Sequence, residues 1–430
     1  MSDFSGFYKL SIEEKLRLLK EKYGLTDDEL AVLRKDGSLG LGTAVNMIEN
    51  VIGTHGLPLG IATNFIINGK EYLIPFAIEE ASVVAAASYG AKLAKESSGG
   101  FTAESDQPVM IGQIQIVGVP SIKEAQKKIS KKKAELISYA NTVDPMVMVK
   151  FGGGLRDIET KEINTPNGKM LIVHLLVDCR DAMGANAVNT LAETLAPQFA
   201  ELSGGKVRLK IISNLAIHRK ARARAVWKKE ILEQSTKGLM KGEEVVDGII
   251  DAWAFAAGDP FRAATHNKGI MNGIDAVVMA TGNDWRAVEA GAHAFAAMDG
   301  KYKPLTKYHK DKNGDLVGEI ELPLAVGLVG GATKVHPTAK IAVKLLGVKS
   351  AQELAQVIAA VGLSQNFAAL RALSSEGIQR GHMRLHARNL ATQAGASSAV
   401  ELEEVVNALV ENKKFNVDFA KETLKKLRGV

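Results

Sequence analysis

The sequence predicts an α+β protein: a large mixed α/β domain with an inserted ferredoxin-like domain, followed by a helical C-terminal flap. Three patterns support this prediction. Residues 110–217 alternate between strand-like and helix-like segments in the order β-α-β-β-α-β, the split βαβ arrangement. Strand and helix patterns on both sides of that segment indicate one larger domain. Residues 378–430 are mostly amphipathic and helical. The expected domain boundaries are 1–109, 110–217, 218–376 and 377–430.

The N-terminal part predicts helices followed by a hairpin. Residues 11–34 carry leucines at helical spacing, which predicts one or two short helices. Residues 60–78 contain two apolar runs joined by Asn68-Gly69, a pair that favours a tight hairpin turn. Residues 80–95 are rich in alanine and predict a helix suited to close packing.

The inserted segment predicts four strands and two helices. The strands are expected at 110–119, 155–163, 170–179 and 207–217, and the helices at 121–141 and 187–202. The second helix has one apolar face, formed by Val188, Leu191, Leu195, Phe199 and Leu202. We expect the chain to return to the large domain near residue 218.

The later part of the chain predicts a helical stretch and a polar loop whose residues suit catalysis. Residues 230–258 are helical in pattern. Lys268 is expected in a loop rich in glycine and asparagine, before a short apolar strand at 276–280 and then Asp284. Two polar loops flanking one strand can bring an ammonium and a carboxylate together. Carbonyl chemistry needs such a pair, because the cation stabilises developing negative charge and the acid fixes its proton state.

Composition indicates a globular protein of two or three domains, because the chain has 430 residues. The single cysteine, Cys179, excludes an internal disulfide and fits a reducing cytoplasm; we expect it to be buried. The first twenty residues are too charged for a secretory signal. The uncharged run from Val51 to Gly69 contains proline, asparagines and glycines, which argues against a spanning helix. We therefore expect a soluble protein without a membrane anchor.

The net charge of +6 comes with basic clusters at 127–133, 219–229, 301–312 and 413–428. Solvated helix faces explain such clusters, and binding of a polyanion explains them too. Aromatic residues make up 5 % of the chain and do not interleave with the basic runs, so stacking on nucleic acid is not indicated. A phosphate-rich cofactor fits the charge equally well.

A cofactor pattern lies between a predicted strand and a predicted helix. The standard Gly-x-Gly-x-x-Gly fingerprint is absent, but Asp181-Ala182-Met183-Gly184-Ala185-Asn186 occupies the equivalent turn. Small residues allow close approach of a ligand, and the N-terminus of a helix favours a pyrophosphate. An ordinary helix start with a capping Asp or Asn explains the same pattern.

Five separated blocks in this order resemble the class II 3-hydroxy-3-methylglutaryl-coenzyme A (HMG-CoA) reductases. They lie at 49–54, 79–88, 181–186, 262–286 and 381–383. The resemblance implies a four-electron, NAD(P)H-dependent reduction of HMG-CoA to mevalonate and coenzyme A, or the reverse oxidation. It also implies a cytoplasmic homodimer with shared active sites, and a higher assembly of dimers stays open.

The resemblance implies four catalytic residues. Lys268 polarises the carbonyl and stabilises oxyanions. Asp284 pairs with Lys268, although a helix cap explains it as well. Glu80 donates a proton at the aldehyde stage, with a capping acid as the other interpretation. His382 protonates the departing coenzyme A thiolate from a C-terminal segment expected to close as a flap over bound substrates.

The same resemblance implies the binding residues. Asp181, Met183, Gly184 and Asn186 belong to the dinucleotide motif, and Asp144 falls where NADH-preferring members place an acid. An acid beside the ribose repels a 2′-phosphate, so NADH is favoured over NADPH, although nearby Arg156 can serve a phosphate instead. The substrate carboxylate and hydroxyl are assigned to Ser82, Asn214, Arg262 and Asn272.

Three further expectations complete the interpretation. Tyr8 and His55 depart from the family pattern, which leaves the coenzyme A phosphate contacts open. No metal is expected, because the histidines lack ligand partners at the required spacing. Two other functions remain as alternatives: an oxidoreductase acting on a different acyl-coenzyme A, and a protein that binds polyanions or nucleic acid.

Overall fold

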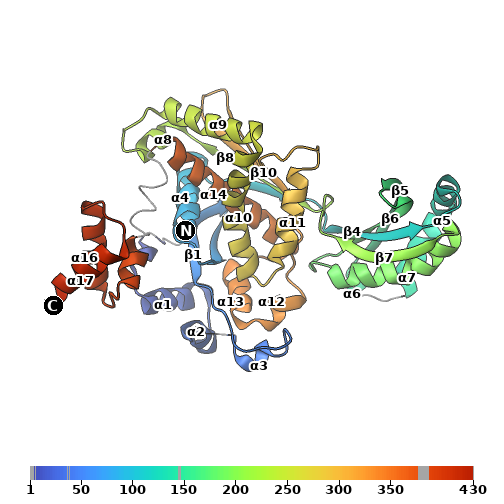
Figure 1. The fold of residues 1–430 in the computed structure, drawn as a ribbon, viewed down its shortest axis with the longest axis horizontal. Helices are drawn as coiled ribbons and strands as arrows, with labels where there is room; N and C mark the ends of the chain where they lie inside the picture. Colours follow the sequence, from blue (N-terminus) through green and yellow to red (C-terminus); the bar gives the residue numbers. More distant parts are fainter. Residues whose placement is uncertain are drawn as a thin grey trace.

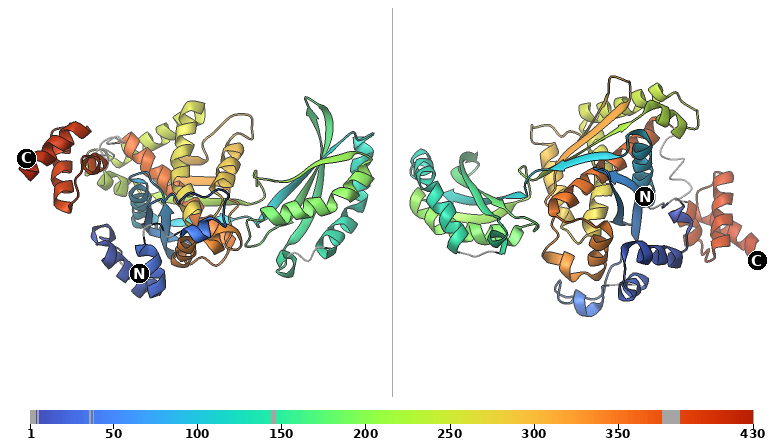
Figure 2. Two further views of the ribbon diagram at one scale, coloured as in Figure 1. Left: turned by 60° about the horizontal axis from the view of Figure 1, so that its bottom comes forward. Right: turned by 180° about the vertical axis from the view of Figure 1, so that it is seen from behind.

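The computed structural model describes residues 4, 6–35, 37, 39–143, 147–375 and 387–429. Two separate β-sheets organise the chain, and a group of short helices follows at the C-terminus (Figure 1). The smaller sheet and its helices project from one side of the larger unit (Figure 2). The predicted mixed fold with a helical C-terminal region is confirmed.

The large sheet has six strands in the order β2-β1-β3-β8-β10-β9. Its strands are β1 (Leu59–Ile67), β2 (Lys70–Ala77), β3 (Phe101–Ser105), β8 (Lys220–Trp227), β9 (Thr306–Lys310) and β10 (Leu316–Pro323). Neighbours are antiparallel except β1 and β3, which are parallel. The predicted hairpin is present: Asn68 and Gly69 have φ of 51° and 78°, as a tight turn between two twisted strands requires.

One long helix occupies the centre of the large unit. Helix α14 (Ala351–Ser374) packs on β3, β8 and β10 and is flanked by α4 (Val83–Ser98), α9 (Gly242–Gly258) and α10 (Pro260–Ala280). Its Phe367 ring stacks on Trp227 of β8 at a centroid distance of 3.9 Å. Within the described residues, α14 is the one helix long and apolar enough to cross a membrane, but 78 % of its apolar window is buried inside the protein. Its apolar sequence is therefore explained by the core.

The prediction of a loop and a strand around Lys268 is wrong, because residues 260–280 form the single helix α10. Pro260 starts the helix, and Asp259 caps it by accepting from the Arg262 N–H at 2.8 Å. The asparagine and glycine that suggested a loop serve packing instead. Asn267 is fully buried and bonds to the Lys303 carbonyl, and Gly273 lies against α14.

The remaining helices of the large unit are shorter. They are α8 (Lys229–Ser235), α11 (Trp285–Ala296), α12 (Gly331–Val335) and α13 (Pro337–Leu346). The predicted helical stretch at 230–258 is thus two helices, α8 and α9, with a turn between them. The N-terminal segment contains η1 (Phe7–Lys9), α1 (Ile12–Tyr23), α2 (Asp27–Arg34) and α3 (Leu41–Ala44).

The inserted segment has the predicted order of elements. They are β4 (Val109–Val117), α5 (Ile122–Val143), α6 (Val147–Lys150), β5 (Gly154–Thr165), β6 (Gly168–Asp178), α7 (Ala185–Ser203) and β7 (Lys206–Ser213). The sheet order β5-β6-β4-β7, antiparallel throughout, is that of a ferredoxin-like fold. Four of the five predicted apolar residues of α7 are completely buried.

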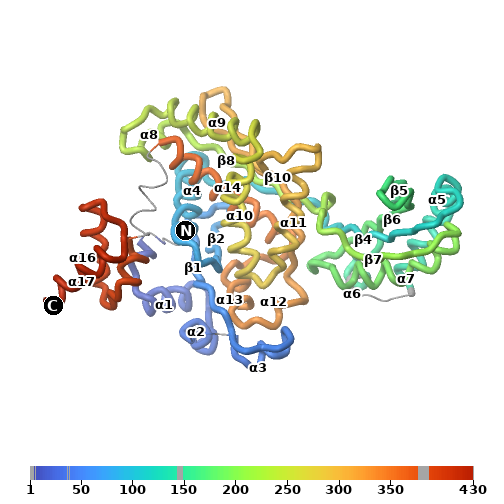
Figure 3. Tube along the Cα trace, in the orientation of Figure 1, coloured from blue at the N-terminus to red at the C-terminus, as the bar shows by residue number. Residues whose placement is uncertain are grey.

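The C-terminal part is helical as predicted. Residues 387–393, α16 (Ala399–Glu411) and α17 (Val417–Arg428) share a small apolar cluster of their own. Figure 3 traces this group at the opposite end of the molecule from the inserted sheet. The flap role and the boundaries after residues 109, 217 and 376 stay predictions.

Candidate active site

Lys268 and Glu80 meet although 188 residues separate them in the chain. Lys268 projects from α10 and its Nζ lies 2.7 Å from Glu80 Oε2. Glu80 sits in the turn between β2 and α4, before the helix begins. The N-cap of α4 is Ser82, with φ of 75°, so Glu80 is not the helix-capping acid. An ammonium and a carboxylate are thus brought together, and both remain accessible to a ligand.

Asp284 lies at the other end of α10. It is the N-cap of α11, where its Oδ1 accepts from the Ala287 N–H at 3.1 Å. Helix α10 extends twelve residues beyond Lys268, which is about 18 Å of rise. In the described part of the chain, Lys268 is ion-paired with Glu80 and no ion pair joins it to Asp284. Of the three groups, Lys268 and Glu80 are therefore the two in direct contact among the described residues.

The predicted substrate residues occupy three different elements. Asn272 follows Lys268 by one turn of α10 and shares its helix face. Arg262 is half-buried in the first turn of the same helix, and this burial lowers the pKa of its guanidinium. Ser82 starts α4 beside Glu80, whereas Asn214 lies in the connection after β7, with its carbonyl against Gly291 of α11.

The cofactor motif forms the start of α7, as predicted. Gly184 is the N-cap residue with φ of 102°, and a Cβ there would overlap the Cys179 sulfur, so only glycine fits. Among the described residues no side chain caps the helix, which leaves its first N–H groups available to an anion. Asn186 is exposed beside them. Cys179 is buried as expected, and burial raises the pKa of its thiol to about 11.

Asp181 has a structural partner that the sequence did not reveal. Its Oδ1 accepts from the N–H of Ala351, the first residue of α14, at 2.8 Å. Its carbonyl accepts from Leu328 and Val329. The motif is therefore anchored to the large unit, and the Asp181 carboxylate stabilises the N-terminus of the central helix.

Arg219 is a buried residue beside the cofactor motif that the sequence did not single out. It is 4 % exposed and was counted within a basic cluster at 219–229. Its guanidinium donates to the carbonyls of Ala182 and Met183, both at 3.1 Å, and to that of Val326. Its neighbours in sequence alternate between buried alanines and charged residues. That alternation indicates a strand with one buried face, and Arg219 falls in step with the buried alanines. The alternation is therefore the sequence signal that predicts its burial.

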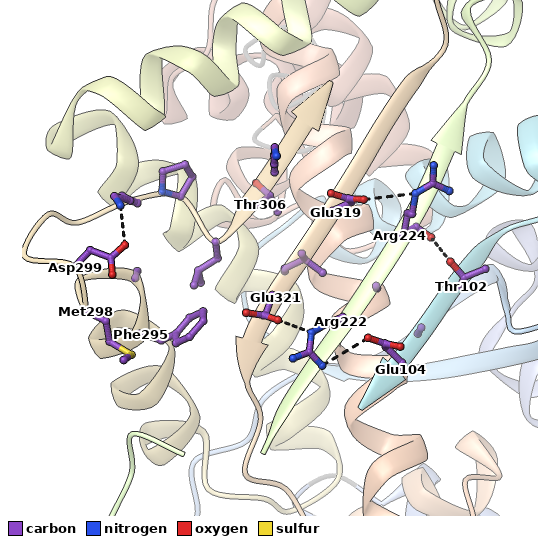
Figure 4. Close-up of a pocket in the computed structure, with 18 residues that line it drawn as sticks. Thr102, Glu104, Arg222, Arg224, Phe295, Met298, Asp299, Thr306, Glu319 and Glu321 are labelled. Carbon is purple, nitrogen blue, oxygen red and sulfur yellow. Dashed lines mark hydrogen bonds and ion pairs between the residues drawn. The ribbon is translucent and has the colours of Figure 1, made fainter. Parts of the chain in front are cut away.

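The charged face of β8 lines a groove of about 790 Å³ on the sheet (Figure 4). Arg222 pairs there with Glu104 and Glu321, and Arg224 pairs with Glu319. This part of the basic cluster is thus neutralised by neighbouring strands. Among the predicted site residues that the structure describes, none lines this groove, so it is separate from the Lys268 site.

Two buried titratable groups lie on α10 near Lys268. Burial, together with a hydrogen bond and repulsion from Glu289, raises the pKa of Asp275 to about 8. Burial and the charge of Arg262 lower the pKa of His266 to about 3, and its Nε2 lies 2.6 Å from the Thr306 hydroxyl. His266 is thus a neutral structural residue. Across the described ranges, no cluster of three or more His, Cys, Asp or Glu could hold a metal.

Two predicted residues cannot be placed. Asp144 and His382 lie outside the described residues, as does the whole block at 381–383. The preference for NADH that rested on Asp144 and the protonation of the thiolate by His382 stay predictions.

An open helix N-terminus on an inserted ferredoxin-like unit, together with an ammonium–carboxylate pair, suits a nicotinamide-dependent enzyme acting on a carbonyl group. Comparison with known proteins makes the assignment more specific. A family profile described as hydroxymethylglutaryl-coenzyme A reductase matches residues 11–387. The chain belongs to this family.

Named relatives agree with the family. The chain is 58 % identical over 428 residues to the 3-hydroxy-3-methylglutaryl-coenzyme A reductase of Archaeoglobus fulgidus, covering 100 % of this chain and 95 % of the relative. It is 38 % identical over 400 residues to a probable reductase of Borreliella burgdorferi, covering 89 % and 87 %. The resemblance inferred from the five sequence blocks is confirmed.

Solved structures agree as well. The class II reductase of Streptococcus pneumoniae bound to NADPH in open conformations matches with a TM-score of 0.81 at 45 % identity, covering 97 % of this chain and all of that one. A second structure of the Streptococcus pneumoniae reductase matches with a TM-score of 0.83 at 44 % identity, covering 99 % and 100 %. The fold is therefore that of the class II enzymes.

Proposed function

We propose that this protein reduces HMG-CoA to mevalonate and coenzyme A, consuming two reduced nicotinamides and two protons. The observation that carries the proposal is the 2.7 Å contact between Lys268 and Glu80, in a chain of the reductase family. The reaction passes through a hemithioacetal and an aldehyde, so each stage develops negative charge on a carbonyl oxygen. A fixed ammonium that binds this oxygen lowers both barriers.

The proposed roles follow from the groups available. Lys268 binds the thioester oxygen and then the aldehyde oxygen, and Glu80 passes a proton to the oxygen that Lys268 holds. Arg262 and Asn272 hold the free carboxylate and hydroxyl of the substrate, with Ser82 and Asn214 completing the pocket. His382 delivers the proton that converts the departing thiolate to free coenzyme A.

The nicotinamide cofactor supplies the hydride when it is bound. The free N–H groups of α7 suit its pyrophosphate, and Met183, Gly184 and Asn186 surround that position. NADH is the proposed partner because of Asp144. NADPH is the alternative, supported by the NADPH-bound Streptococcus pneumoniae relative. The guanidinium groups of Arg156 and Arg180, which share Asp178 and the Gly152 carbonyl, are also partly exposed.

A homodimer with shared sites is proposed on two observations. The segment 41–52 exposes a series of apolar side chains to solvent, namely Leu41, Val45, Ile48 and a fully exposed Ile52. An apolar surface of this kind indicates a partner. In addition, no ion pair among the described residues joins Asp284 to Lys268, and we infer that a second copy brings them together. A cytoplasmic location is proposed from the closeness to class II enzymes.

The alternative functions have weaker support. Binding of nucleic acid through the basic residues of β8 is not favoured, because Arg222 and Arg224 are paired with acids. Activity on another acyl-coenzyme A depends on Arg262. Thioesters without a free carboxylate should be turned over poorly if this guanidinium holds the carboxylate of HMG-CoA.

This proposal is tested by measuring the decrease in absorbance of the reduced nicotinamide when HMG-CoA is added, with NADH and with NADPH in turn. Lys268→Ala should lose about 100- to 1000-fold in kcat, because the oxyanion then has no cation. Lys127→Ala removes an exposed lysine of α5 that is also ion-paired, to Glu124, and should retain full activity. Wild-type turnover that persists in Lys268→Ala would refute the assigned role.

A further inference from the structure

Arg219 and Asn283 lie between the proposed nucleotide motif and the proposed catalytic aspartate. We propose that these two residues are positioning residues that hold the motif in register with Asp284, and hence the nicotinamide over the reacting carbon. The inference rests on the proposed function and adds two residues for which neither the motif nor the family resemblance gave a role. It is carried by a continuous series of hydrogen bonds between residues 182 and 284.

The first link is the buried guanidinium of Arg219. Arg219 begins the return of the chain to the large sheet, and it donates to Ala182 and Met183 of the motif and to Val326 of a separate loop. Across the described chain its partners are neutral carbonyls, and no carboxylate forms an ion pair with it. Burying a cation in this way costs free energy, since carbonyls replace only part of its hydration. A planar fork with five N–H donors is the side chain suited to joining two loops.

The second link is the close contact between the motif and residues 326–329. The N–H groups of Leu328 and Val329 donate to the Asp181 carbonyl at 2.8 and 3.2 Å. Gly327 packs so tightly that a Cβ there would lie 2.5 Å from the Met183 nitrogen. The two segments therefore move together, because neither can shift without breaking buried hydrogen bonds.

The third link is Asn283. Its Oδ1 accepts from the Gly327 N–H at 2.7 Å, and its Nδ2 donates to the Thr281 hydroxyl at 3.0 Å. Its own N–H donates to the Val278 carbonyl at the end of α10. Asn283 is directly followed by Asp284, the N-cap of α11. The position of the loop at 326–329 is thus transmitted to the aspartate through a single side chain.

The test is a double-mutant cycle on turnover of HMG-CoA, with Arg219→Lys and Asn283→Ala. Lysine keeps the charge but cannot reach three carbonyls on two loops. Each single variant should lose about 10- to 100-fold in kcat while KM for HMG-CoA stays within about twofold, because misplacement affects hydride transfer more than substrate binding. The double variant should lose little more than the worse single variant, because either change breaks the same connection.

The matched control is Arg222→Lys, an arginine three residues further on, in β8, that pairs with acids including Glu321 on the neighbouring strand. The small loss in kcat caused by Arg222→Lys should multiply with the loss caused by Asn283→Ala when the two changes are combined. The inference is overturned if the losses from Arg219→Lys and Asn283→Ala multiply in the same way. If Arg219→Lys does not fold, Asn283→Ala decides alone, and a kcat within twofold of wild type is the negative result.

The proposed function and this inference can fail separately. If the wild type binds nucleotide but does not turn over HMG-CoA, the proposed function is wrong. The double-mutant cycle is then measured on the Kd for the nucleotide instead of on kcat. There too, coupled losses support the connection and multiplying losses overturn it. If the wild type turns over HMG-CoA and the cycle shows no coupling, the function stands and the positioning role of Arg219 and Asn283 is abandoned.

Discussion

Lys268 and Glu80 form a partly exposed ion pair, with side-chain exposures of 60 % and 35 %. An ion pair in contact with water contributes only about 0–1 kcal/mol to stability. Folding alone therefore gives little reason to bring these two residues together. Their meeting is better explained by chemistry, because the same exposure allows a substrate oxygen to reach the ammonium.

Asp275 is the residue for which pH should matter most. It lies two turns after Lys268 on the same face of α10, and one of its oxygens is buried without a hydrogen-bond partner. Glu289 of α11 faces it, and Glu289 in turn lies 3.8 Å from His293, which contacts the Tyr302 hydroxyl at 2.7 Å. Burial and the neighbouring Glu289 raise the pKa of Asp275 to about 8, from 3.8 in the unfolded chain.

The expected consequence is a loss of stability as pH rises. Because the pKa of Asp275 is raised to about 8 on folding, its stabilising contribution is complete below about pH 4 and is lost between pH 4 and 8. The slope is at most about 1.4 kcal/mol per pH unit. Asp275→Asn keeps the shape without the titration. Urea unfolding at pH 5 and pH 8 should show a smaller difference for this variant than for the wild type; equal differences contradict the prediction.

At the scale of elements, α10 separates chemistry from packing by its two faces. Lys268, Asn272 and Asp275 lie on one face, at spacings of four and three residues. Ile270, Gly273, Ile274 and Val277 lie on the opposite face, where they are buried toward α14 and the core. The site residues are therefore held by a helix whose opposite face is buried. Placing polar groups on the accessible face costs the protein little stability.

Close packing of α14 against α4 depends on Gly90. A Cβ at this position would lie 2.6 Å from the Ser364 carbonyl oxygen, a backbone atom that cannot move aside. Gly90→Ala should lower stability by about 1–3 kcal/mol, because the two helices must separate. Thermal unfolding measures this. The matched control is Gly258→Ala at the end of α9, where a Cβ meets nothing within 4 Å and no loss is expected.

At the scale of the whole molecule, two observations bear on the proposed dimer. Among the described residues Lys268 pairs with Glu80, and no ion pair joins it to Asp284, the N-cap of α11. The apolar segment at 41–52 gives a second copy a surface to bind. A two-fold dimer can satisfy both observations at once, because any contact it makes is made twice.

Mixed dimers can test whether two chains share each site. Lys268→Ala and Asp284→Asn should each be inactive alone, and Asn keeps the helix cap. If Lys268 and Asp284 of one site come from different chains, co-refolding equal amounts should restore about one quarter of wild-type activity, since half the dimers are mixed and each has one intact site. If both residues come from the same chain, no mixed dimer has an intact site and activity stays absent.

The sequence by itself determined the β-α-β-β-α-β insertion, the hairpin at Asn68-Gly69 and the family, because periodicity, turn residues and motifs are local properties. Only the tertiary structure decided that Lys268 lies on a helix, since its neighbours Asn267 and Gly273 are used in packing between distant segments. Tertiary structure also decided that Glu80 faces Lys268, that Asp181 accepts from the first N–H of α14 and that Arg219 is buried. Each of these depends on contacts across more than thirty residues, and no local pattern encodes such contacts.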